Sequence, residues 1–293
     1  MFAPKLVLLA SLSCLLAAFT LHSHADKLAS QEITYYIVED LTSPFQIASE
    51  GVNKGGLITD LVEIIFRDTP LQLVPKPLPV NRLHRVIRED TGTVWLAYDA
   101  KVWNSLTDVG DFVEEPLFTV NHALLTCNDH PKSIAGEADL LGMTLVILDN
   151  FNYPELRRME ARRALTLTGV EKYEQGFRLT AVGRVDGFVE MEIRLRYNLA
   201  QESEPPSDCY RFVNMDAVIP PYDIYLSLSK QASPELRDMV TQRVRQIKGS
   251  EDYKQVFARY TDRRNKADQT KRAEAATAAP CPPACPTAAN QPL

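Results

Sequence analysis

The segment over residues 55–88 constrains the fold of this chain more than any other. It opens on two glycines and continues over 57–68 with apolar residues at helical spacing, until a Thr-Pro pair ends the helix. A short apolar run predicts a strand over 71–74, which the following prolines end, and a second amphipathic helix is expected over 82–88. Because a β-rich run at 32–38 precedes this segment, strands and helices alternate. Such alternation is typical of an α/β fold with largely parallel sheets.

A series of short motifs follows a defined order along the chain. They are Pro44-Phe45, Gly55-Gly56-Leu57 with Asp60-Leu61, Pro79 with Arg82, Gly183-Arg184-Val185-Asp186-Gly187, Tyr222 to Ser229, Ser233-Pro234-Glu235-Leu236, and Tyr260. In kind and in order, these motifs resemble those of the family 3 periplasmic solute-binding proteins, which include the amino-acid-binding components of ABC importers. The resemblance covers residues 31–262.

The resemblance implies the two-lobed periplasmic binding protein type II fold of the α/β class. In this fold each lobe is a mostly parallel sheet flanked by helices, and two crossover strands join the lobes. Lobe 1 is expected to comprise residues 31–119 and 222–262, and lobe 2 residues 120–221. Two crossings make a hinge, so closure of the lobes around a ligand is the expected motion.

Residues 1–25 are expected to form a secretory signal peptide. Lys5 precedes an apolar segment over 6–21, and Ser23-His24-Ala25 forms a cleavage site of the small-x-small type. A membrane anchor is the alternative, but the apolar segment is shorter than the ~20 residues that a spanning helix needs. We therefore expect export to the periplasm with removal of the signal peptide.

The other end of the chain is expected to be a disordered tail over residues 263–293. It is rich in alanine and proline and has few large apolar residues. Its pair Cys281 and Cys285 either bridges locally or binds a metal, and a lone pair without a nearby histidine is weak evidence for a zinc site.

Composition excludes some functions. The chain has 38 acidic and 32 basic residues, a net charge of −6, and no basic stripe with interleaved aromatic residues, which argues against a nucleic-acid partner. The histidines His84, His122 and His130 do not share metal-ligand spacing, and no catalytic signature occurs. We therefore expect a monomeric protein with no cofactor, no metal and no enzymatic activity.

Cys127 and Cys209 are the two cysteines in the body of the chain. Disulfides persist in exported proteins, so a bridge between them is one expectation. The resemblance puts both residues in one lobe near the hinge, which is consistent with that bridge. Two buried free thiols are the alternative, and the sequence leaves both open.

Loops at the carboxyl ends of strands supply the candidate ligand-binding residues, because ligands of open α/β sheets gather there. One such loop covers 99–104, and another leads into an arginine-rich helix whose expected N-cap is Asn152. The candidates from these strand ends and from the Pro-Phe loop are Phe45, Tyr98, Lys101, Trp103, Asn150, Asn152 and Tyr153. For each aromatic residue, core packing is the competing interpretation.

The sequence departs from the family pattern at one place. Family members commonly carry an arginine beyond the 99–104 loop that binds an amino-acid carboxylate, but residues 105–116 contain no arginine. This absence puts α-amino-acid binding in doubt, and Arg82 or Lys101 is expected to substitute. In amino-acid-binding members of the family an acidic residue near this place holds the ligand ammonium, so the resemblance implies that role for Glu190, which stands at the carboxyl end of a predicted buried strand. An exposed or helix-capping role is the alternative.

The sequence therefore predicts a periplasmic protein that captures a small polar solute, amino-acid-like or an organic acid, between two lobes. Its partner would be an inner-membrane ABC permease or a sensor. One rival is a degenerate fold that acts as an interaction or scaffold protein without a small ligand, which an open, suitably lined cleft would oppose. The other rival is a small-molecule lyase or hydrolase, whose signature would be an acid/base pair across the cleft.

Overall fold

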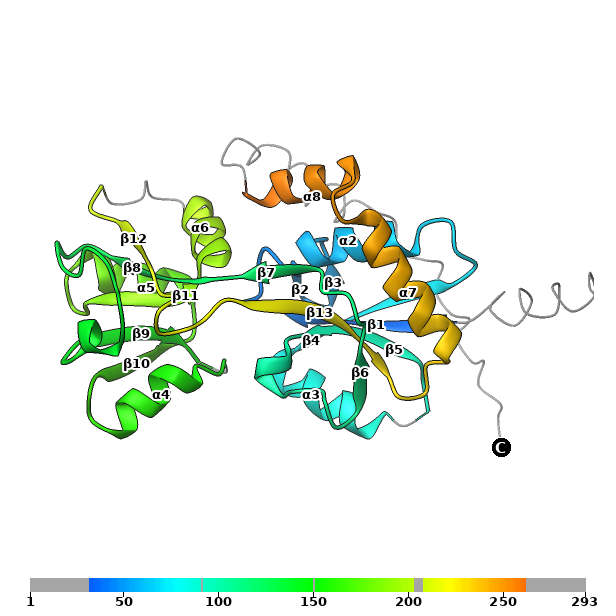
Figure 1. The fold of residues 1–293 in the computed structure, drawn as a ribbon, viewed down its shortest axis with the longest axis horizontal. Coiled ribbons are helices and arrows are strands. Elements are labelled where there is room, and N and C mark those ends of the chain that lie inside the picture. Colours follow the sequence, from blue (N-terminus) through cyan, green and yellow to red (C-terminus); the bar gives the residue numbers. More distant parts are fainter. Residues whose placement is uncertain (1–31, 91, 150, 203–207, 262–293) are drawn as a thin grey trace, which may run out of the picture.

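The computed structural model describes residues 32–90, 92–149, 151–202 and 208–261 (Figure 1). The predicted signal peptide (1–25), the predicted tail (263–293) with Cys281 and Cys285, and the candidate residue Asn150 lie outside the described residues.

One sheet, which with its helices we call lobe 1, has the strand order β4-β1-β5-β13-β6, and β7 also pairs with β13. Its strands are β1 (Glu32–Glu39), β4 (Gln72–Pro79), β5 (Trp95–Asp99), β6 (Gly110–Phe112), β7 (Phe118–Val120) and β13 (Tyr222–Ser229). Its helices are α2 (Leu57–Phe66), α3 (Val80–Glu89), the 3-10 helix η1 (Lys101–Trp103), α7 (Pro234–Ile247) and α8 (Glu251–Thr261), beside the short hairpin β2 (Ala48–Ser49) and β3 (Val52–Asn53).

The other sheet, with its helices lobe 2, has the order β10-β9-β11-β8-β12. Its strands are β8 (His122–Thr126), β9 (Thr144–Leu148), β10 (Thr166–Val170), β11 (Gly187–Met191) and β12 (Arg211–Asn214). Its helices are the 3-10 helix η2 (Glu137–Leu140), α4 (Pro154–Ala161), α5 (Tyr173–Ala181) and α6 (Glu192–Gln201).

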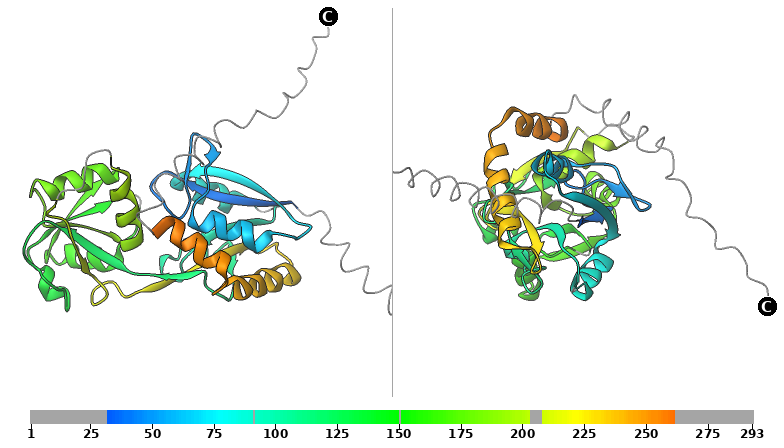
Figure 2. Two further views of the ribbon diagram at one scale, coloured as in Figure 1. Left: turned by 90° about the horizontal axis from the view of Figure 1, so that it is seen from above. Right: turned by 90° about the vertical axis from the view of Figure 1, so that its right-hand side faces the viewer.

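Two passages of the chain join the lobes, from β7 to β8 and from β12 to β13, and they run side by side between the lobes (Figures 1 and 2). The predicted two-lobed α/β fold is thereby confirmed. Each sheet is mixed, because β1 is parallel to β4 and β5, and β9 to β10 and β11, whereas β13 and β8 are antiparallel to their neighbours. The lobe boundaries assigned from sequence stay a prediction, supported by this division of the strands.

Both sheets are covered on two faces, and the period-two alternation of strand residues explains this. In β9, Leu145 and Ile147 belong to the core cluster under α4, while Val146 and Leu148 belong to the cluster under α5 and α6. Runs of buried aliphatic residues of this kind are typical of strands with helices on both faces.

Several element boundaries differ from the sequence prediction. β4 extends through three prolines to Pro79, because it lies at the sheet edge and pairs only with β1, where a missing N–H on the open side costs nothing. α3 begins at Val80 with Pro79 as its N-cap, two residues before the predicted start. α2 ends at Phe66, before the Thr-Pro pair, and Asp68 then adopts positive φ.

The glycine-pair motif anchors the last described helix to the first. Gly56 has φ +126°, and a Cβ there would lie 2.6 Å from the carbonyl oxygen of Phe45, so a side chain has no room. Its N–H donates to the Tyr260 hydroxyl (3.0 Å), and that hydroxyl donates to Asp60 (3.0 Å), which also receives Arg259. The motif thus closes lobe 1 by holding α8 against α2.

Candidate functional site

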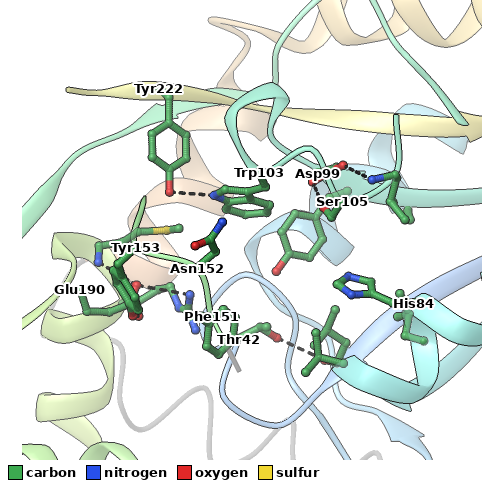
Figure 3. Close-up of a pocket in the computed structure, with 18 of the residues that line it drawn as sticks. Thr42, His84, Asp99, Trp103, Ser105, Phe151, Asn152, Tyr153, Glu190 and Tyr222 are labelled. Carbon is green, nitrogen blue, oxygen red and sulfur yellow. Dashed lines mark hydrogen bonds and ion pairs between the residues drawn. The ribbon is translucent and has the colours of Figure 1, made fainter. Parts of the chain in front are cut away.

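A cavity open to solvent at its mouth lies between the two lobes (Figure 3). The empty space in it is about 860 Å³ when the open solvent at the mouth is included. The lobe 1 wall and the hinge contribute Tyr36, Val38, Thr42, Val80, Leu83, His84, Ala97, Tyr98, Asp99, Trp103, Ser105, Leu106 and Tyr222. The lobe 2 wall contributes His122, Phe151, Asn152, Tyr153, Glu190, Met191 and Arg194.

Asp99 organises the lobe 1 wall at the carboxyl end of β5. Its carboxylate accepts hydrogen bonds from the Ser105 hydroxyl (2.6 Å) and from the backbone N–H groups of Ala100 (2.8 Å) and Leu106 (3.0 Å). Burial raises the pKa of Asp99, and the three donors oppose this effect. The carboxylate therefore fixes the loop that carries Trp103, and its hydrogen-bonding capacity is largely used.

Five aromatic side chains form a continuous series along the cavity, which we call the aromatic arc. Neighbouring ring centroids are 6.0 Å apart for Tyr98 and Trp103, 6.0 Å for Trp103 and Tyr222, 5.6 Å for Tyr222 and His122, and 6.4 Å for His122 and Tyr153. The indole N–H of Trp103 donates to the Tyr222 hydroxyl at 3.0 Å. The arc therefore crosses from lobe 1 to lobe 2 at the hinge, and edge contacts stabilise it.

A buried ion pair stands at the lobe 2 end of the aromatic arc. Glu190 lies 3.3 Å from Arg194, and their side chains are 1% and 2% exposed. The Glu190 carboxylate also accepts the Tyr153 hydroxyl (2.7 Å) and the Met191 N–H (2.8 Å). Burial alone would lower the pKa of Arg194, but Glu190 together with Tyr173, Tyr98 and Tyr153 outweighs this effect, so the net pKa of Arg194 is raised.

Arg194 also ties lobe 2 to lobe 1. It donates to the carbonyl of Leu41, which lies in the loop after β1 and has positive φ (54°). The guanidinium carbon lies 4.7 Å from the centroid of the Phe151 ring. Nearby, Asn198 of α6 donates to the carbonyl of Ser43 at 3.0 Å. The guanidinium is therefore engaged by a carboxylate, a carbonyl and an aromatic ring.

Burial favours the neutral form of the two histidines of the cavity. Burial lowers the pKa of His84, and Arg88 lowers it further. Burial also lowers the pKa of His122, against the opposing effect of Glu190. Glu155 and Asp216 also raise the pKa of His122, each with a smaller effect than Glu190. Around His122, carboxylates therefore outnumber cations.

The structure brings five of the predicted ligand residues together in the cavity wall and separates three others from it. Those in the wall are Tyr98, Trp103, Asn152, Tyr153 and Glu190. Those outside it are Phe45, Arg82 and Lys101. Tyr153, and not Asn152, is the N-cap of α4, and it makes no side-chain capping bond.

The surroundings of the three residues outside the cavity wall explain why they do not line it. Phe45 is fully buried in the lobe 1 core, with its ring 5.4 Å from Phe118. Arg82 is exposed on α3, whose buried residues are Leu83 and Ile87. The ammonium of Lys101 lies 4.3 Å from the centroid of the Tyr225 ring, outside the cavity wall. The cation that faces Glu190 is Arg194 and neither of the two predicted.

Sequence reasoning missed Arg194, Asp99, His84, His122 and Tyr222. Glu190 and Arg194 are four residues apart, but Glu190 is the penultimate residue of β11, and Arg194 lies in α6, which starts with Glu192 directly after that strand. A Glu-x-x-x-Arg pattern at a strand-to-helix junction was the available signal for this pair.

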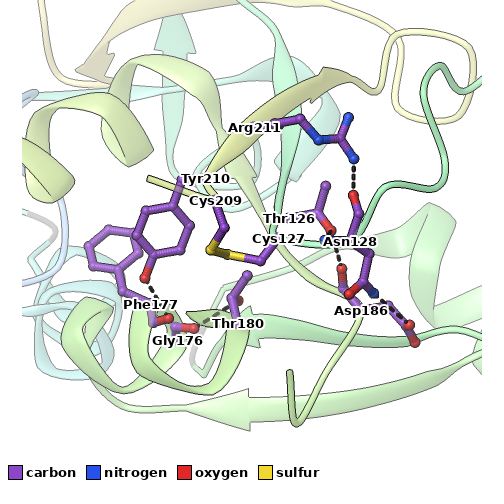
Figure 4. The surroundings of a disulfide bond; sticks show 10 residues. All are labelled: Thr126, Cys127, Asn128, Gly176, Phe177, Thr180, Asp186, Cys209, Tyr210 and Arg211. Carbon is purple, nitrogen blue, oxygen red and sulfur yellow. Dashed lines mark hydrogen bonds between the residues drawn. A yellow bond between two sulfur atoms is a disulfide. The ribbon is translucent and has the colours of Figure 1, made fainter. Parts of the chain in front are cut away.

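Cys127 and Cys209 form a disulfide, so the bridged alternative holds (Figure 4). The bond joins the end of β8 to the start of β12, at the far end of β8 from the cleft residue His122, and so not near the hinge as expected. Beside it, Asp186 of the glycine-flanked motif accepts the N–H of Thr144 (2.7 Å) and the amide of Asn128 (3.1 Å).

The glycine that ends this motif is required by packing. A Cβ at Gly187 would lie 2.4 Å from Leu124 and 2.7 Å from the carbonyl oxygen of Leu125, both on the adjacent strand. The motif from Gly183 to Gly187 therefore stabilises the lobe 2 sheet. Asp186 holds strand ends together, and Gly187 allows its strand to approach the adjacent strand closely.

Within the described residues, no three His, Cys, Asp or Glu side chains are grouped so as to hold a metal ion. None of the helices within residues 32–90, 92–149, 151–202 and 208–261 has the length and apolar character to cross a membrane.

Comparison with known proteins supports the fold alone. No protein-family model matches the chain, and no curated protein matches it in sequence. The substrate-binding protein of an amino acid ABC transporter superposes with a TM-score of 0.57 at 16% identity, covering 78% of this chain and 98% of that one. The periplasmic VFT2 domain of BvgS from Bordetella pertussis gives 0.59 at 14% identity, covering 82% and 96%.

A third solved structure is the ancestral amino acid-binding protein AncCDT-1, a precursor of cyclohexadienyl dehydratase. It gives a TM-score of 0.57 at 13% identity and covers 82% of this chain and 98% of that one. The resemblance expected from the sequence motifs is thus confirmed at the level of the fold, which amino-acid-binding proteins, a periplasmic domain of BvgS and a precursor of an enzyme share.

Proposed function

We propose that this protein is a solute-binding protein that captures a small polar molecule between its two lobes. The observation that carries the proposal is the cavity itself, which both lobes line and which lies at the carboxyl ends of β5 and β11. Most pockets of this kind combine apolar and aromatic walls with a few fixed polar groups. The aromatic arc, Asp99 and the Glu190–Arg194 pair meet that description.

The open, lined cavity favours this proposal over a scaffold role without a small ligand. A scaffold has no need of a solvent-open cavity in which a carboxylate is held by three donors. A binding rather than a catalytic role, residence in the periplasm after removal of residues 1–25, and a monomeric state are parts of the proposal. Solved structures with this fold include the substrate-binding protein of an amino acid ABC transporter and a periplasmic domain of BvgS. Either an ABC permease or a sensor is the proposed partner.

A thermal-shift screen of the exported chain tests the proposal. The library contains amino acids, organic acids, amines and small sugars. A ligand that binds only the folded state at a hundredfold excess over its Kd stabilises by about 2.7 kcal/mol, which raises the melting temperature measurably. A shift that is lost in the cavity variant Trp103→Leu supports solute capture.

The matched control for this screen is Phe212→Leu, an aromatic substitution on β12 outside the cavity wall. It should retain the shift. A folded protein that responds to no compound in the library contradicts the proposal and favours the scaffold role. Mass spectrometry of the recovered ligand distinguishes binding from turnover, because a lyase or hydrolase would return a changed compound.

A further inference from the structure

We propose that the cleft selects a small organic cation, an ammonium carried on an apolar or aromatic body, over carboxylate ligands. This inference rests on the proposed function and names the ligand class for the same cavity. It follows from the charges that line the cavity, from the way Arg194, the one cation among the described lining residues, is engaged, and from the aromatic arc.

The first step is the charge of the cavity. Among the described lining residues, two carboxylates, Asp99 and Glu190, and one guanidinium, Arg194, leave one net negative charge. The two histidines add none in the neutral form. An anion entering this space would meet uncompensated negative charge at low effective dielectric constant, and a cation would be attracted.

The second step is that Arg194 is not available to a ligand carboxylate. It is 2% exposed, pairs with Glu190 at 3.3 Å and donates to Leu41. Its Nε has no partner among the described residues, but this atom is buried from solvent. A carboxylate would have to displace Glu190 from its own guanidinium, which would leave a buried charge unpaired.

Other cations near the cleft are also engaged elsewhere. Arg88 donates to the Ser105 carbonyl (2.6 Å) and to Asp108 (3.2 Å), and it does not line the cavity. Lys101 lies over Tyr225, and Arg82 is exposed on α3. No described residue therefore offers a bidentate partner for a ligand carboxylate in the wall.

The third step is the aromatic arc. Aromatic faces attract ammonium groups, most strongly where water is excluded, and Trp is the strongest of them. The arc places Trp103 at its middle, between Tyr98 and Tyr222. Asp99 supplies the net negative charge at the lobe 1 end of the arc, next to Tyr98, whereas the charge of Glu190 at the lobe 2 end is offset by Arg194. A cation between the two lobes would thus be attracted by aromatic rings from both lobes and by the net charge at Asp99.

Isothermal titration calorimetry on the exported chain tests this inference with compounds of matched skeleton. One set is tyramine, tyrosine and 4-hydroxyphenylacetate, which carry an ammonium, both charges and a carboxylate on one aromatic body. The other set is choline and glycine betaine, which differ by a carboxylate. In at least one set, the cation should bind at least tenfold more tightly than its carboxylate-bearing counterparts.

Any result other than this preference for the cation overturns the inference. A carboxylate-bearing compound that binds as tightly as its matched amine contradicts the charge argument. Binding of a neutral sugar alone, in the wider thermal screen, also contradicts it and leaves the proposed function standing. A folded protein that binds no compound in either experiment overturns both.

Two variants test the residues that carry the argument. Trp103→Leu should weaken binding of the preferred cation at least tenfold, because the central ring is lost, while the control Phe212→Leu should not. Glu190→Gln frees Arg194 and should reduce the preference for the cation at least tenfold. If Glu190→Gln does not fold, the Trp103 comparison decides, and an unchanged affinity there refutes the role of the aromatic arc.

Discussion

Replacing Arg194 by methionine tests the central electrostatic feature of the cleft. Methionine keeps an apolar stem of similar length but removes the charge that faces Glu190. At an effective dielectric constant of about 20, two unit charges at the observed 3.3 Å interact by about 5 kcal/mol. Breaking a buried pair by removing one partner typically costs about 3–5 kcal/mol, so Arg194→Met should lower the free energy of unfolding by that amount.

The same helix supplies a matched control. Arg196 and Glu192 form an ion pair with the same four-residue spacing, at 2.5 Å, but their side chains are 44% and 28% exposed. Solvent screens such a pair, and Arg196→Met should cost less than about 1 kcal/mol. The comparison separates the effect of burial from that of pairing.

Urea unfolding followed by tryptophan fluorescence measures both variants. The double variant Arg194→Met with Glu190→Gln should recover a large part of the loss, because no unpaired charge is then left in the core. The reasoning is refuted if Arg194→Met costs no more than Arg196→Met, or if the double variant is less stable than Arg194→Met alone.

Three further predictions concern stability. The pKa values of the two cavity histidines, buried His122 and partly buried His84, are lowered, so the unfolded chain binds protons more readily and stability should fall as pH drops below about 6.5. Urea unfolding at pH 7.5 and 5.5 measures the fall, and His122→Gln should make it smaller. Replacing Cys127 and Cys209 by serine should lower the free energy of unfolding by about 2–5 kcal/mol, because the bridge spans 82 residues. If loss of the bridge is the cause, the reduced wild-type chain should have the same free energy of unfolding as the serine variant. Gly187→Ala should cost about 1–3 kcal/mol of stability by overpacking. Gly136→Ala, where no atom lies near the added Cβ, should stay within about 0.5 kcal/mol of wild type. Thermal unfolding measures both costs, and equal costs would contradict the packing argument.

Much of the fold was predictable because local rules and long-range packing agree. The glycine pair and the motif ending in Gly187 lie where the neighbouring backbone leaves no room for a side chain. The alternation of strands and helices matches the layers of each lobe. Prolines misled the prediction for β4, because a proline ends a central strand but is tolerated on an edge strand, and edge position is not a local property.

The cleft was less predictable, because it depends on which side of an element a residue faces. Tyr98, Trp103 and Tyr153 were found by their position at strand ends. Phe45 was misassigned, because a residue in a loop beside a cleft can equally turn inward to the core. Arg194 was missed, because its role depends on a strand and a helix that meet without a loop between them.

The anchoring of α8 by the glycine pair affects the order in which the lobes assemble. The hydrogen bond from Gly56 to Tyr260 joins residues 204 positions apart, so lobe 1 is built from both ends of the described chain. The sheet of lobe 2 needs only residues 122–214, and its disulfide lies within them. Because a chain is synthesised from its N-terminus, all strands of lobe 2 are therefore made before β13, α7 and α8 complete lobe 1, and the cleft residue Tyr222 is made with β13.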